Sequence, residues 1–444
     1  MRVAIIGAGI SGLSTAFYLQ KANNDIELLI YEANAHLGGT MHTVDVDGFL
    51  FEEGGNGFLS NKPDMLQLVE DCGGSHLLMR SEDAARRRFI YTDAMHPLPD
   101  GPGKFFSTRL LSLPQKLRVM GEVFMPAKRN DEDETLQSFG YRRLGQAFTD
   151  VFLDAMTAGI YGTTADRVSV QAAFPLVASL EKEHGGLFKG MLARRKKQAG
   201  PGGVLMSFQG GTGTIIKHLY HSIRAEWHLG EPVEHITRTD PGYTVWVAGQ
   251  AQPVDQVILA VPAYAAAHLV TELDRELAAQ LDQINYSPIA VVGLGWKQLD
   301  HPLDGFGVLT TASARLPFLG VLWDSSIFPD RAPSGMKSVR VMLGGQREPE
   351  RVNHDPETLI QLSREGLSSA LGIDAEPDAT FVKRWPKGLP GYPVGHIAAV
   401  DALMARAEHH PGLHLTGNAY RGIAMNDCVR NGRLTAEKAV AWTH

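Results

Sequence analysis

The strongest constraint on this chain is a glycine-rich turn that lies between a short β-branched strand and a helix, close to the N-terminus. Residues 7–12 read Gly-Ala-Gly-Ile-Ser-Gly, which is the GxGxxG pattern of dinucleotide-binding βαβ units. A strand is predicted over Arg2–Ile6 and a helix over Ser11–Ala22, where apolar residues recur at helical spacing. The next predicted strand, Ile26–Tyr31, leads directly to Glu32. A glycine turn alone is a weak signal. Together with the strand before it, the helix after it and Glu32, it predicts a parallel α/β sheet that binds a dinucleotide.

Each glycine of the turn has its own physical role. Gly7 permits the tight turn, Gly9 lets the backbone approach a pyrophosphate, and Gly12 lets the helix lie close to the strand. Unpaired N–H groups at the helix start, near Ser11, face the phosphate charge. The carboxylate of Glu32 can accept hydrogen bonds from a ribose 2′-hydroxyl and would repel a 2′-phosphate.

The residues after Glu32 favour FAD over NAD. A second glycine pair, Gly38-Gly39, follows soon after, and Gly54-Gly55 comes after an acidic pair. An NAD-binding enzyme needs no second glycine pair at this place. A larger cofactor that stays bound needs the protein backbone to come close to it at more points along its length. A helix predicted from about Asn426 supplies a second N-terminus, which could face the end of a flavin where negative charge gathers on reduction.

Composition places the chain among ordinary globular proteins. Its 444 residues are too many for one core, so two or three packed units are expected. A net charge of −7 argues against nucleic acid as a general partner. The two cysteines, Cys72 and Cys428, cannot form a disulfide framework, which fits a reducing, cytoplasmic setting and buried, inert thiols. No run of about 20 apolar residues occurs, so no membrane span is predicted.

The character of the chain changes near residue 112, where helical patterns with long charged side chains replace strand patterns. Helices are predicted over Leu113–Met125 and Thr135–Met156. The stretch Gly186–Gln198 combines Leu187, Phe188 and Met191 with lysines and arginines around Arg194. It could enter an anionic membrane surface, but an exposed helix explains it equally well. Further strands are predicted over Glu234–Arg238, Tyr243–Val247, Gln256–Val261, Ala290–Trp296, Gly307–Thr310, Ser338–Leu343 and Leu413–Leu415, with a helix over Pro356–Leu371.

With these residues in place, the chain resembles the amine-oxidase-like flavoproteins and, within them, the protoporphyrinogen oxidases. The segments that carry the resemblance are Ala158–Gly162, Phe208–Gly211, Leu259–Ala263, Tyr286–Val292, Asp304–Gly307, Trp385 with Leu389–Tyr392, and Gly417–Ile423. The resemblance implies an α/β fold, α+β overall, with three parts. They are a Rossmann-type FAD-binding domain over 1–72, 205–262 and 410–444, a mixed-sheet substrate domain over 73–94 and 263–409, and a helical insertion over 95–204 that rests on a membrane.

The resemblance also implies an activity. FAD would oxidise protoporphyrinogen IX to protoporphyrin IX, and O2 would reoxidise the flavin. Coproporphyrinogen III, which carries four propionates, stays open as the substrate, as do an amine or a polyene for another flavin oxidase or desaturase. A non-redox tetrapyrrole carrier is a further alternative. The implied partners are the tetrapyrrole, O2 and the inner face of the cell membrane, and a homodimer stays open.

A set of cofactor contacts follows from the resemblance, position by position. It comprises Gly7, Gly9, Ser11, Gly12, Glu32, Ala33, Gly38, Gly39, Thr40, Gly55, Asn56, Val233, Trp385, Gly417, Asn418, Ile423, Ala424 and Met425. Val233 matches a backbone contact to adenine, while Trp385 and residues 423–425 match positions around the isoalloxazine. Thr40 stands where many relatives have arginine, which weakens the inference about contacts to the flavin ring.

Four residues are implied as substrate contacts. Arg88 matches an arginine that pairs with a propionate, Ile289 and Phe306 match side chains that sandwich a pyrrole ring, and Gly159 matches a backbone contact. From sequence alone, residues 86–88 form a solvated charge run and Ile289 belongs to the core. No general base and no metal ligand is predicted, because the flavin performs the difficult step. No lysine matches the one near flavin N5 in amine oxidases, which disfavours amine chemistry.

Overall fold

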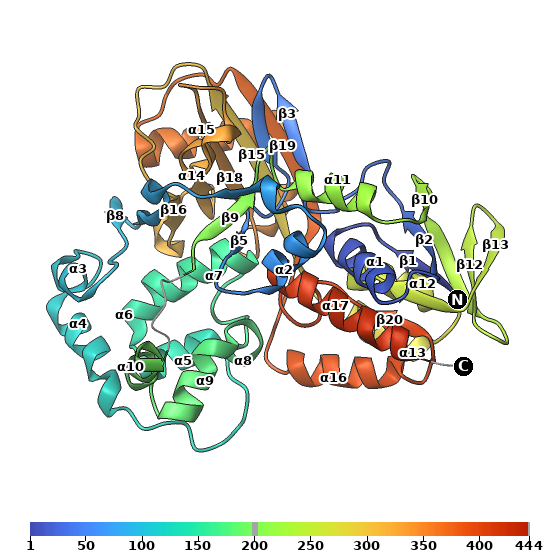
Figure 1. The fold of residues 1–444 in the computed structure, drawn as a ribbon. Helices are drawn as coiled ribbons and strands as arrows, with labels where there is room; N and C mark the ends of the chain where they lie inside the picture. Colours follow the sequence, from blue (N-terminus) through green and yellow to red (C-terminus); the bar gives the residue numbers. More distant parts are fainter. Residues whose placement is uncertain (198–202, 443–444) are drawn as a thin grey trace.

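The predicted nucleotide-binding unit forms a five-stranded parallel sheet in a computed structural model that describes residues 1–197 and 203–442 (Figure 1). In spatial order its strands are β10 (Glu226–Leu229), β2 (Glu27–Glu32), β1 (Arg2–Ile6), β14 (Gln256–Leu259) and β20 (Leu413–Leu415). Almost every residue of β1 and β2 is buried, as expected for a parallel sheet that is covered on both faces. Segments from the start, middle and end of the chain therefore share one sheet.

Helices cover both faces of this sheet. One layer contains α1 (Ile10–Ala22), α11 (Gly213–Ser222) and α17 (Met425–Ala441), and the other contains α12 (Ala263–Val270), α13 (Arg275–Asp282) and α16 (His396–Ala407). Val3 and Ile5 of β1 pack into the first layer, and Ala4 and Ile6 pack into the second. This alternation follows from the two-residue period of a strand. The predicted βαβ unit is therefore confirmed.

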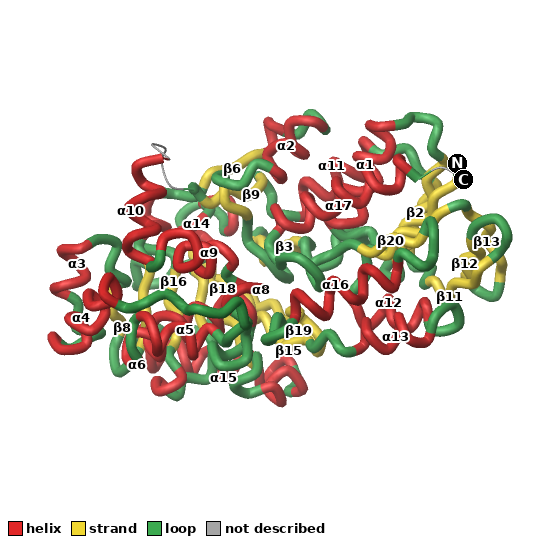
Figure 2. Tube along the Cα trace, turned by 90° about the horizontal axis from the view of Figure 1, so that it is seen from below, coloured by secondary structure: helices red, strands yellow, loops and turns green. Residues whose placement is uncertain are grey.

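The hairpin predicted near residue 240 is a three-stranded antiparallel sheet. It consists of β11 (Val233–Arg238), β12 (Tyr243–Val247) and β13 (Gln250–Val254). Its third strand was not predicted, because only two residues separate it from the end of β12 and Pro253 weakens the strand pattern. Figure 2 shows this sheet and the helical region at opposite ends of the molecule.

A second, mixed sheet of seven strands lies beside the first unit. Its order is β19 (Ala379–Pro390), β15 (Tyr286–Trp296), β18 (Lys337–Gly344), β17 (Gly320–Leu322), β16 (Gly307–Thr310), β7 (Arg88–Tyr91) and β8 (Met95–Pro97), with α15 (Pro356–Leu371) packed against it. Only β16 and β7 pair in parallel. β8 extends this sheet beyond residue 94, the predicted limit of that part of the substrate domain. The edge strand β19 was not predicted, because Pro386 and Gly388 interrupt its pattern, although an edge strand tolerates proline.

Short elements connect the two sheets. They are the hairpin β3 (Thr43–Val46) and β4 (Phe49–Glu52), the small sheet β5 (Phe58–Leu59), β9 (Leu205–Phe208) and β6 (Leu78–Arg80), and the helices α2 (Asp64–Asp71) and α14 (Asp324–Ile327). Glu52 at the end of β4 accepts hydrogen bonds from Thr212 and Thr43 and lies 3.4 Å from Arg331. This carboxylate therefore ties the hairpin to two distant parts of the chain.

The region predicted to be helical contains several short helices. They are α3 (Pro102–Ser107), α4 (Leu113–Met120), α5 (Leu136–Arg143), α6 (Gln146–Phe148), α7 (Asp154–Tyr161), α8 (Val170–Ala173), α9 (Pro175–His184) and α10 (Leu187–Lys197). The prediction of one helix over Thr135–Met156 is wrong: Gly145 has a φ of 91°, so the chain leaves α5, and a π-helical turn precedes α7. The helix predicted over Leu113–Met125 ends at Met120, and a 3₁₀ turn follows it. Gln198 of the predicted basic stretch lies outside the described residues.

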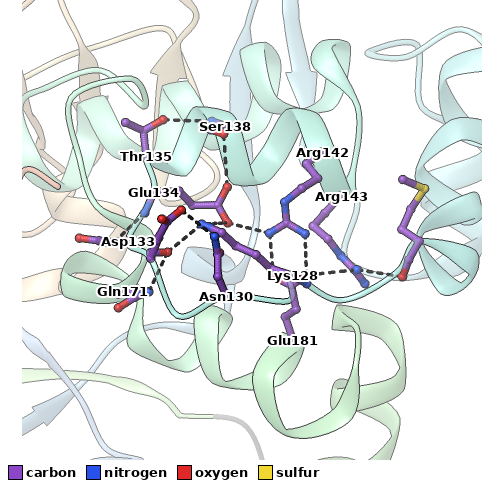
Figure 3. Close-up of polar contacts among 12 residues, drawn as sticks. Lys128, Asn130, Asp133, Glu134, Thr135, Ser138, Arg142, Arg143, Gln171 and Glu181 are labelled. Carbon is purple, nitrogen blue, oxygen red and sulfur yellow. Dashed lines mark hydrogen bonds and ion pairs between the residues drawn. The ribbon is translucent and has the colours of Figure 1, made fainter. Parts of the chain in front are cut away.

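Charged side chains hold these short helices together, and Figure 3 shows those around Arg142, Glu134 and Glu181. Arg143 and Glu122 are both fully buried and form an ion pair. Glu122 also accepts hydrogen bonds from the first N–H groups of α10. Arg142 bridges Glu134 and Glu181, with N–O distances of 2.7 and 2.6 Å. The helices are therefore fixed to one another by charge as well as by apolar contact. Within residues 1–197 and 203–442, no helix is both long and apolar enough to cross a membrane.

Candidate active site

A cavity of about 450 Å³ opens where the carboxyl ends of β1, β2 and β14 meet α1. Ligands of open parallel sheets bind at this edge. Predicted cofactor contacts line it, namely Gly7, Gly9, Ser11, Glu32, Ala33, Gly38, Gly39, Thr40, Val233, Trp385, Gly417 and Asn418. Residues that are hundreds of positions apart in sequence therefore surround one space of the size typical for a ligand.

Three of these glycines leave room that the protein itself does not use. Chain neighbours aside, a Cβ atom on Gly9 would come no closer than 3.7 Å to any residue, one on Gly39 no closer than 3.7 Å, and one on Gly417 no closer than 4.0 Å. Since all three line the cavity, added side chains would occupy cavity space. Bare backbone around an open cavity is the arrangement that close approach of a dinucleotide requires.

Two other glycines serve the packing of the turn. Gly7 has a φ of 103°, and a Cβ atom there would lie 2.6 Å from the carbonyl oxygen of Ala260. A Cβ atom on Gly12 would lie 2.0 Å from the carbonyl oxygen of Gly7. Gly12 thus lets α1 approach the strand and does not line the cavity. No side chain caps α1, whose N-terminus begins after Gly9, so its free N–H groups suit a phosphate.

Glu32 is held as a fixed acceptor at the other side of the turn. It is buried, and one oxygen accepts a hydrogen bond of 3.0 Å from the Ala8 N–H. Its other oxygen accepts from the backbone and side-chain nitrogens of Asn34, at 3.0 and 2.7 Å. The carboxylate cannot rotate away, so it is placed to receive a ribose hydroxyl. Together with Val233, it marks the end of the cavity suited to the adenosine part.

The opposite end of the cavity is bordered by β19. The Trp385 indole N–H donates to the Glu53 carbonyl oxygen at 2.8 Å, and Lys383, two residues earlier, lines the cavity too. Lys383 Nζ lies 2.7 Å from Glu53 Oε2 and 4.5 Å from the Trp385 ring centre. No sequence signal marks this lysine, because its acidic partner is more than 300 residues away.

The remaining predicted cofactor residues, Gly55, Asn56 and residues 423–425, do not line this cavity. A Cβ atom on Gly55 would lie 2.9 Å from the Met425 methyl carbon, so the two segments touch. Asn56 donates to Asp324 Oδ1 at 3.3 Å, while its buried Oδ1 has no hydrogen-bond partner among the described residues. That oxygen is available to a bound donor. Ile423 and Ala424 precede α17 directly, and α17 has no side-chain cap at its start.

One tyrosine fixes the turn that leads to α17. The Tyr392 hydroxyl donates to the Asn418 carbonyl oxygen at 2.7 Å and accepts from the Gly422 N–H at 2.8 Å. Burial raises the pKa of this phenol above its ordinary value, so it stays protonated. The ring of His396 stacks on it with centroids 4.1 Å apart. Sequence reasoning did not single out Tyr392, although this residue lies in Leu389–Tyr392, one of the segments that carry the resemblance.

Arg88 and Phe306, two of the predicted substrate contacts, are neighbours. The Arg88 guanidinium carbon lies 5.1 Å from the centre of the Phe306 ring. Arg86 and Arg87 pair with acidic side chains, whereas no acidic partner of Arg88 is recorded among the described residues. Arg88 is exposed, and its charge is therefore open to a carboxylate ligand.

Ile289 and Gly159 lie closer to the cofactor cavity than this pair. Ile289 is buried in a cluster with Ala158, and Trp385 packs against the same cluster. The register of β15 and β19 places Ile289 opposite Trp385. Gly159 follows Ala158 and faces Leu309, whose methyl carbon would lie 2.6 Å from a Cβ atom there. Phe306 packs in a different cluster, so the sandwich of one ring between Ile289 and Phe306 stays a prediction.

Both cysteines are free thiols. Cys428 is buried and lines the cofactor cavity, and burial raises its pKa to about 11. Burial also raises the pKa of Cys72. A thiol with a raised pKa carries little thiolate near neutral pH and is a poor nucleophile.

A larger cavity of about 590 Å³ lies between α16, β20 and α17. Gly417 is the one residue that it shares with the cofactor cavity. Its other lining residues include none of the predicted contacts, so size alone does not identify the site. Burial lowers the pKa of His414 in its wall to about 4, so this imidazole is neutral near pH 7.

The comparisons with known proteins agree with this geometry. The chain is 28% identical to the coproporphyrinogen III oxidase of Bacillus subtilis (strain 168), covering 99% of this chain and 98% of that protein. It is 29% identical to human protoporphyrinogen oxidase, covering 98% and 97%. A crystal structure from Exiguobacterium sp. 255-15, provisionally named a protoporphyrinogen oxidase, superposes with a TM-score of 0.87 at 26% identity and covers 98% of each chain.

The family model of the flavin containing amine oxidoreductases matches residues 10–440. That range spans the cavity, both large sheets and the helical region. The cofactor of this family is FAD, which fits the glycine cradle, the free N-terminus of α1 and the fixed carboxylate of Glu32. The chain therefore belongs to the flavin containing amine oxidoreductase family and is an FAD-dependent oxidoreductase.

Proposed function

We propose that this chain oxidises a porphyrinogen to a porphyrin, with protoporphyrinogen IX as substrate and O2 as electron acceptor. One observation carries the proposal: Trp385, at the end of the cofactor cavity away from Glu32, lies opposite Ile289 in an apolar cluster. An apolar wall beside the flavin end of the cavity suits a flat tetrapyrrole. Relatives named for both porphyrinogens support the same chemistry.

The residues of this chain bind and orient the substrate in this proposal. A bound flavin accepts two electrons per turnover, and three turnovers remove the six electrons that separate porphyrinogen from porphyrin. Ile289 and Trp385 exclude water from the reacting carbon, and Arg88 holds a propionate. No protein base is needed, because pyrrole N–H protons can leave to water.

An aerobic assay of the purified protein tests this proposal. Protoporphyrinogen IX and coproporphyrinogen III are supplied separately, and porphyrin fluorescence is compared with autoxidation in buffer. Faster fluorescence growth with protoporphyrinogen IX is the expected result. A clear preference for coproporphyrinogen III would transfer the proposal to that substrate, and inertness toward both would refute it.

Replacing Arg88 by alanine is expected to weaken substrate binding and leave the flavin in place. A charge-assisted hydrogen bond contributes about 1.5–3 kcal/mol, so KM should rise roughly 10-fold or more. Arg86→Ala is the matched control, since Arg86 is also exposed but faces Asp83. Steady-state kinetics and the visible spectrum measure both effects. Loss of flavin from the Arg88 variant would show that this residue serves the cofactor site.

We also propose that the helical region makes peripheral contact with a membrane. Leu113, Leu117, Met120 and Phe124 recur at spacings of four, three and four along α4 and its 3₁₀ turn, and all are exposed, Phe124 to 87%. They form an apolar strip that no other described residue covers. The sequence pattern indicates membrane contact for the stretch that forms α10. Leu187 of that helix is buried in the core, whereas Met191 and Leu192 are exposed.

Sedimentation with vesicles tests this contact. Phosphatidylcholine vesicles with and without phosphatidylserine should carry the wild-type protein down, and Leu117→Glu with Phe124→Glu should leave it in solution. Leu434→Glu is the control, because Leu434 is an exposed leucine of α17, outside the strip. Equal sedimentation of all three proteins would contradict the proposed surface.

A further inference from the structure

An ion pair between a buried carboxylate and a partly exposed lysine borders the end of the cavity where the flavin ring is proposed to lie. Glu53 is 5% exposed, and its Oε2 lies 2.7 Å from the ammonium of Lys383. Its Oε1 lies 3.1 Å from Nδ1 of His42. The ring of His36, which lines the cavity, stacks on His42 with centroids 4.2 Å apart. Charged and titratable groups therefore continue from the cavity wall into the protein.

The position of the lysine is fixed by the strand that carries it. Lys383 and Trp385 are two residues apart on β19, so their side chains point to the same face. The Lys383 ammonium lies 4.5 Å from the Trp385 ring centre, and the Trp385 indole N–H is bonded to the Glu53 backbone. The carboxylate and the ring thus hold one cation at the cavity wall.

The two ends of the cavity determine what this cation faces. Glu32 and Val233 mark the adenosine end, and the N-terminus of α1 marks the phosphates. The ring of the flavin then lies toward β19, where Trp385 and Lys383 line the wall. Two-electron reduction with uptake of one proton adds one negative charge to the ring. In a site that excludes water, a fixed cation stabilises such a charge more than it would in bulk solvent.

We propose that the Lys383–Glu53 pair sets the reduction potential of the bound flavin, with the ammonium favouring reduction and the carboxylate opposing it. This inference rests on the ring placement in the proposed function, and it holds for any substrate. The next residue, Arg384, does not belong to this cavity wall. Its side chain faces the other side of β19 and donates to the His354 carbonyl oxygen.

Variants of opposite charge test this proposal on the FAD-loaded full chain, without substrate. Lys383→Met leaves Glu53 alone at the wall and should make reduction at least tenfold less favourable, a fall of about 30 mV for a two-electron couple. Glu53→Gln should shift the potential in the opposite direction. Lys383→Arg keeps the charge and should restore the wild-type value. Equilibration with a reference dye under reducing titration measures each potential.

Arg384→Met is the matched control, because it removes the same charge from the neighbouring residue and should leave the potential unchanged. An equal fall in this variant, or unchanged potentials in both Lys383→Met and Glu53→Gln, would overturn the proposal. If Lys383→Met does not hold FAD, the comparison of Glu53→Gln with wild type and Lys383→Arg decides, and an unchanged potential in Glu53→Gln would overturn the proposal. Porphyrinogen assays are independent of this readout, so failure of the substrate proposal would not mimic failure of this one.

Discussion

Replacing Gly9 by valine is expected to abolish FAD binding without unfolding the chain. Gly9 has an extended backbone, with φ −76° and ψ 177°, which valine adopts readily. Its Cβ atom would come no closer than 3.7 Å to any residue other than its chain neighbours. The added side chain would instead stand in the cavity, between the cofactor and the N-terminus of α1. Losing two charge-assisted hydrogen bonds costs about 3–6 kcal/mol, so affinity should fall roughly 100-fold or more.

Gly12→Val separates this effect from a general loss of structure. A Cβ atom on Gly12 would lie 2.0 Å from the Gly7 carbonyl oxygen, so this variant should fail to fold. Absorbance at about 450 nm after addition of FAD measures how much cofactor is bound, and circular dichroism shows whether the chain is folded. A yellow, fully loaded Gly9→Val protein would show that the cofactor does not cross the turn at this point.

Replacing Arg143 by methionine is expected to destabilise the chain by about 3–5 kcal/mol, because it leaves Glu122 charged and unpaired in the interior. Both side chains have no solvent exposure. Arg143 also donates to the carbonyl oxygens of Met125 and Pro126, at 3.0 and 3.1 Å, and these acceptors would lose their donor. Urea unfolding followed by circular dichroism measures the change.

Lys182→Met provides the comparison for a charge pair on the surface. Lys182 and Asp131 are 2.9 Å apart but are 73% and 85% exposed. Solvent screens such a pair, so its loss should cost less than about 1 kcal/mol. Equal unfolding midpoints for the Arg143 and Lys182 variants would mean that the buried pair contributes no more than the exposed one.

Local patterns were enough to predict much of the fold. The glycine turn, the strand before it and Glu32 after it predicted the βαβ unit, because a phosphate-binding turn needs specific residues at fixed spacing. The strands Gly307–Thr310 and Leu413–Leu415 and the helix Pro356–Leu371 have the predicted bounds. In each, the apolar period and the end signals lie within a few residues of each other. The prediction of one long helix over Thr135–Met156 is wrong, because Gly145 has a positive φ that ends the helix. The spacing of apolar residues does not reveal such a backbone conformation.

The sequence by itself determined the glycine turn with its acceptor Glu32 and the identity of most elements, because those depend on residues that are near neighbours in the chain. The tertiary structure decided which strands share a sheet and therefore which distant side chains meet. β19 brings Lys383 to Glu53, and the same register brings Trp385 to Ile289. The tertiary structure also leaves the apolar strip that begins at Leu113 uncovered. Periodicity shows which side chains share a face, whereas only packing between distant segments determines whether that face is buried.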